Sequence, residues 1–274
     1  MQYADLHIHS TYSDGSLTPE QIVNIARQKN IKCISITDHD TIASQYIIKE
    51  QIPDIEIIPG VEFSTEYDDM EIHILGYFID TDSHILIENI NNIQQKRRER
   101  AEKILKKLRE ININIDINDI KSNNNTSFGR GNIGATIAEK GYAKNYKEAF
   151  LKYLDKGKIA YVKGEKLSYK DVLKIINESG GVSVLAHPGK IYRKMSLESI
   201  IKEFKCYGLN GIEVYHASHS NEQKNSFYNL ALKYKVIITG GSDFHYIADD
   251  NCIIGDYGIN QDLLCKFKKL SIYK

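Results

Sequence analysis

The chain has 274 residues, of which 42% are hydrophobic and 26% are charged, a balance that suits one compact soluble domain with room for an insertion. Lysine and arginine (36) equal aspartate and glutamate (36) in number, so the net charge of +0 gives no overall field that attracts a long polyanion. We therefore expect no long nucleic acid as a partner, and any nucleic-acid substrate must be short or locally held.

The cysteines and the N-terminus indicate where the protein resides. The cysteines are scattered and form no CxxC pair, which argues against a thiolate zinc site and against a secreted disulfide framework: Cys33, Cys206, Cys252 and Cys265. Charged residues such as Asp5, Asp14 and Glu20 leave no signal peptide at the N-terminus, and no apolar run is long enough for a membrane span. We expect a cytoplasmic protein with no membrane contact.

Strand patterns alternate with helical patterns along the chain. A strand over residues 3–8 is followed by a helix whose start is marked by Thr18, Pro19 and Gln21, an N-cap, a first-turn proline and the partner of a capping box. Later helices are expected at 168–177, 197–207 and 221–234. The remaining strands are expected at 32–37, 55–61, 71–78, 181–186, 211–215 and 236–240. This alternation predicts an α/β fold with a parallel sheet.

A helical block interrupts this alternation in the middle of the chain. A long charged helix is predicted at 85–110, further helical stretches at 132–140 and 147–154, and an extended linker where isoleucines alternate with polar residues from 111 onward. The basic residues of the long helix are interspersed with glutamates, so we interpret them as a solvated face rather than an RNA contact. The predicted division is a first part at 1–83, an insertion at 84–167 and a second part at 168–274.

Histidines and carboxylates gather where the predicted strands end. His7 and His9 are two apart on a strand, so their imidazoles share one face, although such a pair alone is a weak signal. The carboxyl ends of parallel strands open on one side of a barrel, where residues distant in sequence converge. Buried without partners, these polar groups would each cost kilocalories, which disfavours a purely structural interpretation. The other candidates at strand ends or in the following loops are Asp14, Asp38, His39, Glu62, His187, Asp243 and His245, and His73 lies within the strand expected at 71–78.

Imidazoles and carboxylates without cysteine suit Mn, Zn or Fe. More donors are present than one ion needs, so we expect two or three divalent metal ions, with Glu62 as a natural bridge. Adjacent ions about 3.5–4 Å apart form a clamp for phosphoryl transfer. We predict a metal-dependent phosphoesterase in which Glu62, Asp243 and His39 also act directly in catalysis. The nine predicted metal ligands are His7, His9, Asp14, His39, Glu62, His73, His187, Asp243 and His245.

Taken in order, the motifs resemble those of the polymerase and histidinol phosphatase (PHP) domain family over nearly the whole chain. They read His7-Ile8-His9 with Asp14, Thr37-Asp38-His39, Gly60-Val61-Glu62, His73, His187-Pro188 and Ser242-Asp243-Phe244-His245. The resemblance implies a distorted, TIM-like (β/α)7 barrel with a trinuclear centre. It also implies a grouping of the ligands: one ion held by His7, His9, Glu62 and Asp243, a second by Glu62, His73 and His187, and a third by Asp14, His39 and His245.

The inserted helices are similar to a branch of the family that hydrolyses nucleoside 3′,5′-bisphosphates or trims short RNA from its 5′ end. Phe128-Gly129-Arg130 supports this, as does the segment 211–215 followed by His219-Ser220. The chain departs from the branch in reading Arg130-Gly131-Asn132 where the branch has Arg-Pro-His. We expect Arg130 to clamp a substrate phosphate bidentately, and His219 is a second candidate for substrate contact. The expected partner is a small phosphorylated substrate, a nucleotide or a very short RNA.

Three other functions remain open from the sequence. Histidinol-phosphate phosphatase would use the same metal motifs, although the insertion argues against it. An amidohydrolase barrel also begins with HxH, but it would not need Asp14, His39 and the final DxH motif. A non-catalytic PHP module that binds nucleotides or a polymerase would have lost metal ligands, and none is missing here.

Overall fold

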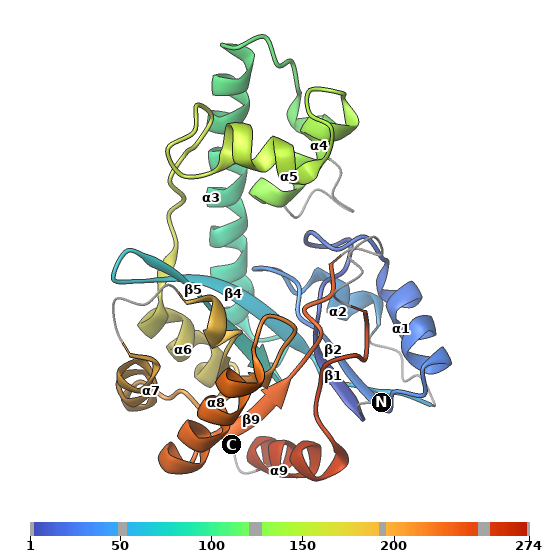
Figure 1. Cartoon of the computed structure of the whole chain (residues 1–274), viewed down its shortest axis with the longest axis vertical. Helices are drawn as coiled ribbons and strands as arrows, with labels where there is room; N and C mark the ends of the chain where they lie inside the picture. The colour runs from blue at the N-terminus through green and yellow to red at the C-terminus, as the bar shows by residue number, and fades with distance from the viewer. Residues whose placement is uncertain (1–2, 49–53, 121–127, 192–195, 246–252, 273–274) are drawn as a thin grey trace.

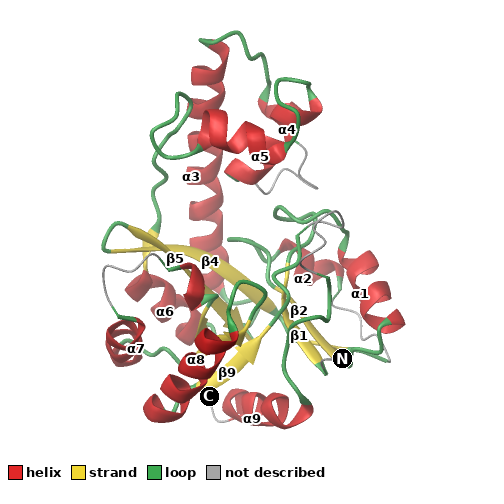
Figure 2. Cartoon of the chain, viewed as in Figure 1, coloured by secondary structure: helices red, strands yellow, loops and turns green. Residues whose placement is uncertain are grey.

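The computed structural model describes residues 3–48, 54–120, 128–191, 196–245 and 253–272. In chain order its helices and strands are β1 (Ala4–Ile8), α1 (Pro19–Gln28), β2 (Cys33–Ile36), α2 (Ala43–Ile47), β3 (Glu56–Ile57), β4 (Gly60–Tyr67), β5 (Met70–Tyr77), α3 (His84–Arg109), α4 (Arg130–Glu139), α5 (Tyr146–Ala149), β6 (Leu167–Ser168), α6 (Tyr169–Glu178), β7 (Val182–Leu185), α7 (Leu197–Cys206), β8 (Gly211–Tyr215), α8 (Asn221–Tyr234), β9 (Ile237–Gly240) and α9 (Gln261–Ile272). This confirms the predicted α/β class. Figure 2 shows the helices lying outside the strands.

The described strands form two sheets. A three-stranded sheet has the order β1-β2-β3 and a six-stranded sheet the order β6-β4-β5-β7-β8-β9. The expected parallel arrangement holds for β1-β2-β3 and for β7-β8-β9, but it is wrong for β5, which is antiparallel to both β4 and β7. Single bridges, Ile8 with Phe244 and His39 with Glu62, connect the sheets beside the predicted ligands.

A tight hairpin causes the antiparallel pairing. The strand expected at 55–61 divides into β3 and the longer β4, which turns into β5 through Asp68 and Asp69. Both aspartates have positive φ, 48° and 60°. Two consecutive left-handed residues are the hallmark of a type I′ turn, whose twist matches that of the paired strands. The hairpin places Glu62 and His73 on neighbouring strands.

The first helix begins as its sequence predicts. The Thr18 side chain accepts a hydrogen bond from the Gln21 backbone N–H, the Gln21 side chain accepts one from the Thr18 backbone N–H, and Pro19 opens the helix. Ile22, Val23 and Ala26 of α1 are buried with apolar residues of β1 and β2. The loop between β1 and α1, which carries His9 and Asp14, is thereby fixed at both ends.

The long helix α3 leaves the sheets and has a second apolar cluster beside it. Figure 1 shows α4 and α5 beside the far half of α3. The buried residues there form a cluster of their own, among them Ile104, Leu108, Ile133 and Leu154. In the predicted linker, Ile113 and Ile115 are buried within this cluster, whereas the neighbouring asparagines are exposed. The division at residues 84 and 167 stays a prediction.

Among the described helices, none is both long enough and apolar enough to cross a bilayer.

Candidate metal centre

The strand β1 and the residue after it supply two imidazoles to one site. His7 lies in β1 and His9 follows directly after it, and both side chains are fully buried. Their Nε2 atoms are 3.2 Å apart. The prediction that the two rings share one face is therefore confirmed.

A first group of candidate ligands comprises His7, His9, Glu62 and Asp243. Nε2 of His7 lies 3.4 Å from both Oε2 of Glu62 and Oδ1 of Asp243. Nε2 of His9 lies 3.2 Å from the same two oxygens. Four ligands placed tetrahedrally at about 2.0–2.1 Å from an ion are spaced roughly 3.3–3.4 Å from one another. The spacing of the four atoms therefore fits a single ion.

A second group comprises His9, Asp14, His39 and His245, whose donor atoms lie within 4.8 Å of one another. Nε2 of His245 is 3.3 Å from Oδ1 of Asp14, and the rings of His9 and His245 stack with centroids 4.1 Å apart. The family resemblance groups Asp14, His39 and His245, and the geometry adds His9 to them.

A third group centres on Glu62, with His39 and His73. Nδ1 of His73 and Nε2 of His187 each lie 3.0 Å from Oε1 of Glu62, whereas Nδ1 of His39 lies 3.0 Å from Oε2. The two oxygens of Glu62 thus face different imidazoles, as a bridging carboxylate requires. All nine predicted ligands converge here, and their division among ions stays a prediction.

Three buried atoms in these groups have no hydrogen bond from the described residues: Oδ1 of Asp14, Nδ1 of His39 and Oε2 of Glu62. Leaving such atoms unpaired costs about 1–3 kcal/mol each, and more for charged groups. All three are lone-pair donors to a cation, and all three belong to the candidate groups. The residues present therefore fit a centre of divalent ions with nitrogen and oxygen ligands.

The protonation of the imidazoles depends on the carboxylates around them. Burial lowers the pKa of His187 to about 4, so this ring is neutral and able to donate its lone pair. Burial also acts to lower the pKa of His9, but hydrogen bonds to Asp243 and Glu62 outweigh it and raise the pKa to about 10. Burial acts to raise the pKa of Asp243, and the charges of His7 and Lys190 hold it well below the usual range.

A carboxylate behind His7 orients that ring. Glu213 is fully buried in β8, and its Oε1 lies 3.1 Å from Nδ1 of His7. Its Oε2 accepts a hydrogen bond of 2.7 Å from the backbone N–H of His187. A carboxylate on the far nitrogen of a metal-binding histidine fixes its tautomer and ring orientation. This role was not predicted from the sequence, although a lone glutamate within the apolar strand 211–215 is a usable signal.

Two further buried aspartates hold the loops that carry candidate ligands. Asp38 is not directed at the centre: its oxygens accept hydrogen bonds from the Ser10 amide and hydroxyl and from the Ser13 hydroxyl, at 2.8, 2.7 and 2.6 Å. Asp5 accepts from the backbone N–H of Ser242 at 2.9 Å and of Gly255 at 2.8 Å. Burial raises the pKa of Asp5 to about 6.

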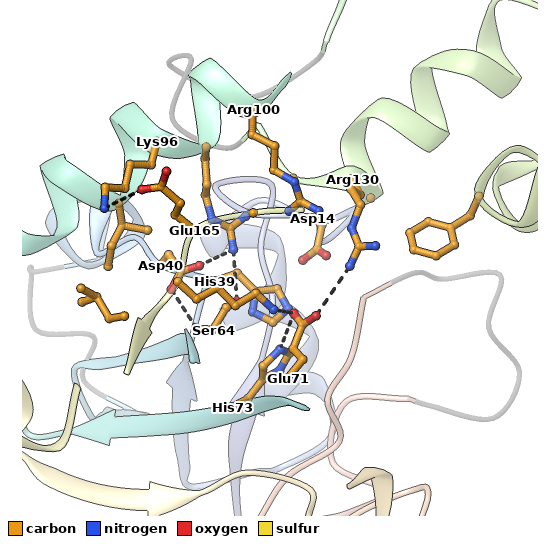
Figure 3. A pocket seen from close by; sticks show the side chains of 18 of the residues that line it. Asp14, His39, Asp40, Ser64, Glu71, His73, Lys96, Arg100, Arg130 and Glu165 are labelled. Carbon is orange, nitrogen blue, oxygen red and sulfur yellow. Dashed lines mark hydrogen bonds and ion pairs between the residues drawn. The ribbon is translucent and has the colours of Figure 1, made fainter. Parts of the chain in front are cut away.

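A cavity of about 190 Å³ lies beside the candidate ligands. Figure 3 shows side chains that line it. Asp14, His39 and His73 line it together with basic residues of α3. Arg97 donates hydrogen bonds to Asp40 and to Oγ of Ser64, the latter at 3.2 Å. The lining of the cavity therefore combines cationic side chains with candidate metal ligands, as a site for a phosphorylated molecule requires.

The solvated-face interpretation of α3 is wrong for part of the helix. Arg97 and Arg100 are about one turn apart and both line the cavity. Arg98, on another side, fits the interpretation, since it is 46% exposed and pairs with Glu102 at 3.5 Å. Ile93, Arg97 and Arg100 are spaced so that they share one helical face. This spacing is the sequence pattern that distinguishes Arg97 and Arg100 from Arg98.

Arg130 opens α4 at the rim of this cavity. Its guanidinium lies 3.6 Å from Oε2 of Glu71 and over the ring of Phe150, 5.3 Å from the centroid. Lys166 approaches Oε1 of Glu71 to 2.5 Å, so two cations already converge on one carboxylate. Asn132, at the departure from the branch pattern, donates a hydrogen bond of 2.8 Å to the Ser13 carbonyl and so ties α4 to the ligand-bearing loop.

Comparison with known proteins agrees with this geometry. The model of the PHP domain family matches residues 5–205. The chain belongs to the PHP domain family. A 5′-3′ exoribonuclease Rnm of Escherichia coli is 32% identical over 88% of this chain and 84% of its own length. A 3′,5′-nucleoside bisphosphate phosphatase of Chromobacterium violaceum is 31% identical over 89% of this chain and 88% of its own length. The predicted assignment to the PHP phosphoesterases is confirmed.

Solved PHP-like structures share the fold. One described as an amidohydrolase from Chromobacterium violaceum, with bound sulfate and no metal, has a TM-score of 0.82 and 27% identity, covering 98% of this chain and 96% of its own. A putative metal-dependent phosphoesterase from Bifidobacterium adolescentis superposes with a TM-score of 0.87 at 24% identity, again over 98% and 96% of the two chains.

His219 lies outside the PHP ligand cluster and away from the cavity. It is only 4% exposed, and both ring nitrogens contact backbone: Nδ1 lies 2.9 Å from the Val214 carbonyl, and Nε2 accepts from the Gly189 amide at 3.1 Å. These contacts hold the turn after His187, so they favour a positioning role over the expected substrate contact. His216 does reach the cluster, where its Nε2 lies 3.1 Å from Oδ2 of Asp243.

Proposed function

We propose that this chain hydrolyses a small phosphomonoester of a nucleotide, a nucleoside 3′,5′-bisphosphate or a short 5′-phosphorylated oligonucleotide, at two or three Mn, Zn or Fe ions. The observation that carries the proposal is the cavity in which Arg97, Arg100, Arg130 and Lys166 lie beside candidate ligands. The activities named for the Escherichia coli and Chromobacterium violaceum relatives support it.

The nine candidate ligands would hold the ions, with Glu62 shared between them. Divalent ions in such a centre lower the pKa of a water molecule and neutralise the charge that develops on phosphoryl oxygens. Glu62 and Asp243 would supply negative charge that offsets the repulsion between such cations. Glu213 holds the His7 ring by its Nδ1 and directs its Nε2 toward the centre.

Arg130 and Lys166 would bind the phosphate that is not cleaved. Both already hold the carboxylate of Glu71, at 3.6 and 2.5 Å, and a phosphate carries the same kind of oxygen ligands with more charge. Lys190, whose Nζ lies 2.6 Å from Oδ2 of Asp243, adds a cation on the other side of the cluster. These side chains favour substrates with two phosphates over those with one.

We also propose that the chain forms a distorted barrel with an inserted helical subdomain. The two sheets, connected by the bridges at Phe244 and Glu62, fit the distorted barrel that the family resemblance implies. The separate apolar cluster beside α3 fits an inserted helical subdomain over residues 84–167.

A metal-resolved activity screen tests the proposal. Protein reconstituted separately with Mn, Zn and Fe is assayed against nucleoside 3′,5′-bisphosphates, 5′-mononucleotides, short RNA and histidinol phosphate. The expected result is the highest kcat/KM for a bisphosphate or a short 5′-phosphorylated oligonucleotide. Preference for histidinol phosphate would overturn the proposal. Nucleotide binding without turnover under any metal would indicate the non-catalytic module.

A further inference from the structure

One face of α3 carries a row of cations beyond the metal centre. Lys96, Arg100, Lys103 and Lys107 follow one another at intervals of four, three and four residues, which places them along one side of the helix. At 1.5 Å per residue the row is about 16 Å long. It leads from the catalytic cavity, lined by Lys96 and Arg100, toward the far end of α3.

The segment 161–165 forms a second wall beside this row. Lys107 donates a hydrogen bond of 2.8 Å to the Tyr161 carbonyl, Arg100 donates one of 2.9 Å to the Val162 carbonyl, and Lys96 pairs with Glu165 at 3.1 Å. The segment therefore runs antiparallel to α3 and is attached at successive turns. These attachments hold the wall in place before any ligand arrives.

The catalytic cavity continues into two neighbouring cavities along this wall. It shares Arg100, Arg130 and Lys166 with a second cavity of about 360 Å³. The second shares Tyr161 and Lys163 with a third of about 510 Å³. The shared lining residues place the three cavities next to one another along α3 and the segment 161–165, and we call them together the groove. Its middle cavity also has four carboxylates in its lining, those of Glu66, Asp69, Glu71 and Asp155.

The far part of the groove is strongly cationic. Lys103, Lys106, Lys107 and Lys163 line the third cavity, and Glu110 is the one carboxylate in that lining. Lys163 is already paired with Glu66 at 2.9 Å and with Asp69 at 3.6 Å, so the cations of α3 supply the uncompensated charge. Lys103 and Lys106 are exposed, and within the described parts of the chain no carboxylate forms an ion pair with either. Two exposed lysines that are in no ion pair with a described carboxylate favour an anionic ligand in this cavity.

An aromatic ring accompanies the cations. Tyr161 lines both the second and the third cavity, and its ring lies 5.9 Å from the Arg130 guanidinium. Backbone phosphates held by lysines, with bases stacked on an aromatic side chain, are how proteins bind single-stranded nucleic acid. A nucleoside bisphosphate would be held by the catalytic cavity alone and would leave this groove empty.

We propose that the groove along α3 binds the phosphodiester backbone of a short single-stranded RNA, downstream of the phosphoester at the metal centre. This inference rests on the proposed function and selects the oligonucleotide from its two substrates. The zero net charge agrees with a short ligand, since the cations are concentrated along one helix face. Affinity should rise with RNA length until the row is covered.

The test compares two double variants of the full-length, metal-loaded protein. Lys103→Glu/Lys106→Glu reverses two charges in the groove, and Lys202→Glu/Lys266→Glu makes the same change of charge at exposed positions of α7 and α9. KM is measured for 5′-phosphorylated oligoribonucleotides of graded length and for a nucleoside 3′,5′-bisphosphate. Equilibrium binding is measured separately with phosphorothioate-linked oligoribonucleotides, which resist hydrolysis.

For the wild type and the control variant, we expect KM to fall as the RNA lengthens. In the groove variant, KM for the longest RNA should rise by about tenfold or more. The slope of log affinity against log salt concentration should become shallower by roughly 1.4, about 0.7 for each phosphate contact removed. Turnover of the bisphosphate should not change. Binding of the longer uncleavable RNA should weaken in the same variant.

Other results separate this inference from the proposed function. Hydrolysis of the bisphosphate with no dependence on RNA length overturns the groove and leaves the proposed function intact. Equal losses for RNA and bisphosphate in the groove variant also overturn it. If no phosphoester is hydrolysed, the proposed function fails, and length-dependent binding that only the groove variant loses would still support the RNA site.

Discussion

Nδ1 of His39 lies 3.0 Å from Oε2 of Glu62, yet neither atom has a hydrogen-bond partner among the described residues. Two lone-pair donors that approach each other without a shared proton are repulsive unless a cation lies between or beside them. Both atoms belong to candidate ligand groups. The pair therefore indicates that this buried arrangement is built to be completed by a metal ion.

Replacing Glu62 by glutamine should abolish hydrolysis and leave the fold intact. The change removes a charge that faces His39, His73 and His187, with little change in volume. We expect kcat to fall by well over tenfold while the circular dichroism spectrum is unchanged. Glu56→Gln, on β3 and paired with Lys268, is the control. Retention of more than about a tenth of kcat, a loss below ~1.4 kcal/mol in barrier height, contradicts the bridging role.

Glu213→Gln should weaken metal binding without altering the ligands themselves. The variant removes the negative charge that faces Nδ1 of His7, and it disturbs the contact with the backbone N–H of His187. Such partners typically contribute 10–100-fold to metal affinity, so a metal titration should show a loss of about that size. Excess metal should restore kcat. The control Glu203→Gln alters a carboxylate bonded to Tyr67 and Tyr169 instead, and equal metal affinity in both variants would rule out a positioning role for Glu213.

Arg130→Ala should raise KM for a substrate with two phosphates by about tenfold or more, since a charge-assisted contact contributes roughly 1.5–3 kcal/mol. Hydrolysis of p-nitrophenyl phosphate should suffer less, because that ester has no second phosphate. Arg98→Ala, on the side of α3 that pairs with Glu102, is the control. Equal losses for both substrates would assign Arg130 to the reacting phosphate, and no loss for either would remove it from the site.

Gly241→Ala should damage the metal centre by displacing the strand that carries His7. A Cβ at this position would lie 2.3 Å from Cβ of His7 and 2.4 Å from its backbone nitrogen. The His7 backbone would have to move to make room for the methyl group, which costs free energy. We therefore expect a loss of about 1–3 kcal/mol in unfolding free energy and weaker metal binding. Thermal unfolding and a metal titration measure both effects. A variant with unchanged Tm and metal affinity would contradict the close packing of β1 against this loop.

The convergence of the nine side chains could be predicted because most of them stand at or just beyond strand ends. His7 and His9, for example, required only the period-two geometry of a strand. The start of α1 could also be predicted, because Thr18 and Gln21 form a capping box with purely local contacts. Local rules of this kind carry over from sequence to structure without knowledge of the rest of the chain.

The antiparallel hairpin could not be predicted in the same way. Its turn places Asp68 and Asp69 at positive φ, a conformation usually signalled by Asn-Gly or Asp-Gly, and this chain has no glycine there. The helix α9 was missed as well, although Leu264 and Phe267 complete the core around Tyr77. The role of Glu213 depends on contacts with His7 and His187, which are distant in sequence and become visible only in the folded chain.

We propose that the buried cluster is a centre for more than one metal ion. Elemental analysis of the purified chain, after reconstitution with Mn, Zn or Fe and removal of free metal, tests it most directly. The three ligand groups predict at least two divalent ions per chain, close enough to share Glu62, about 4 Å apart. One ion or fewer per chain would contradict the claim.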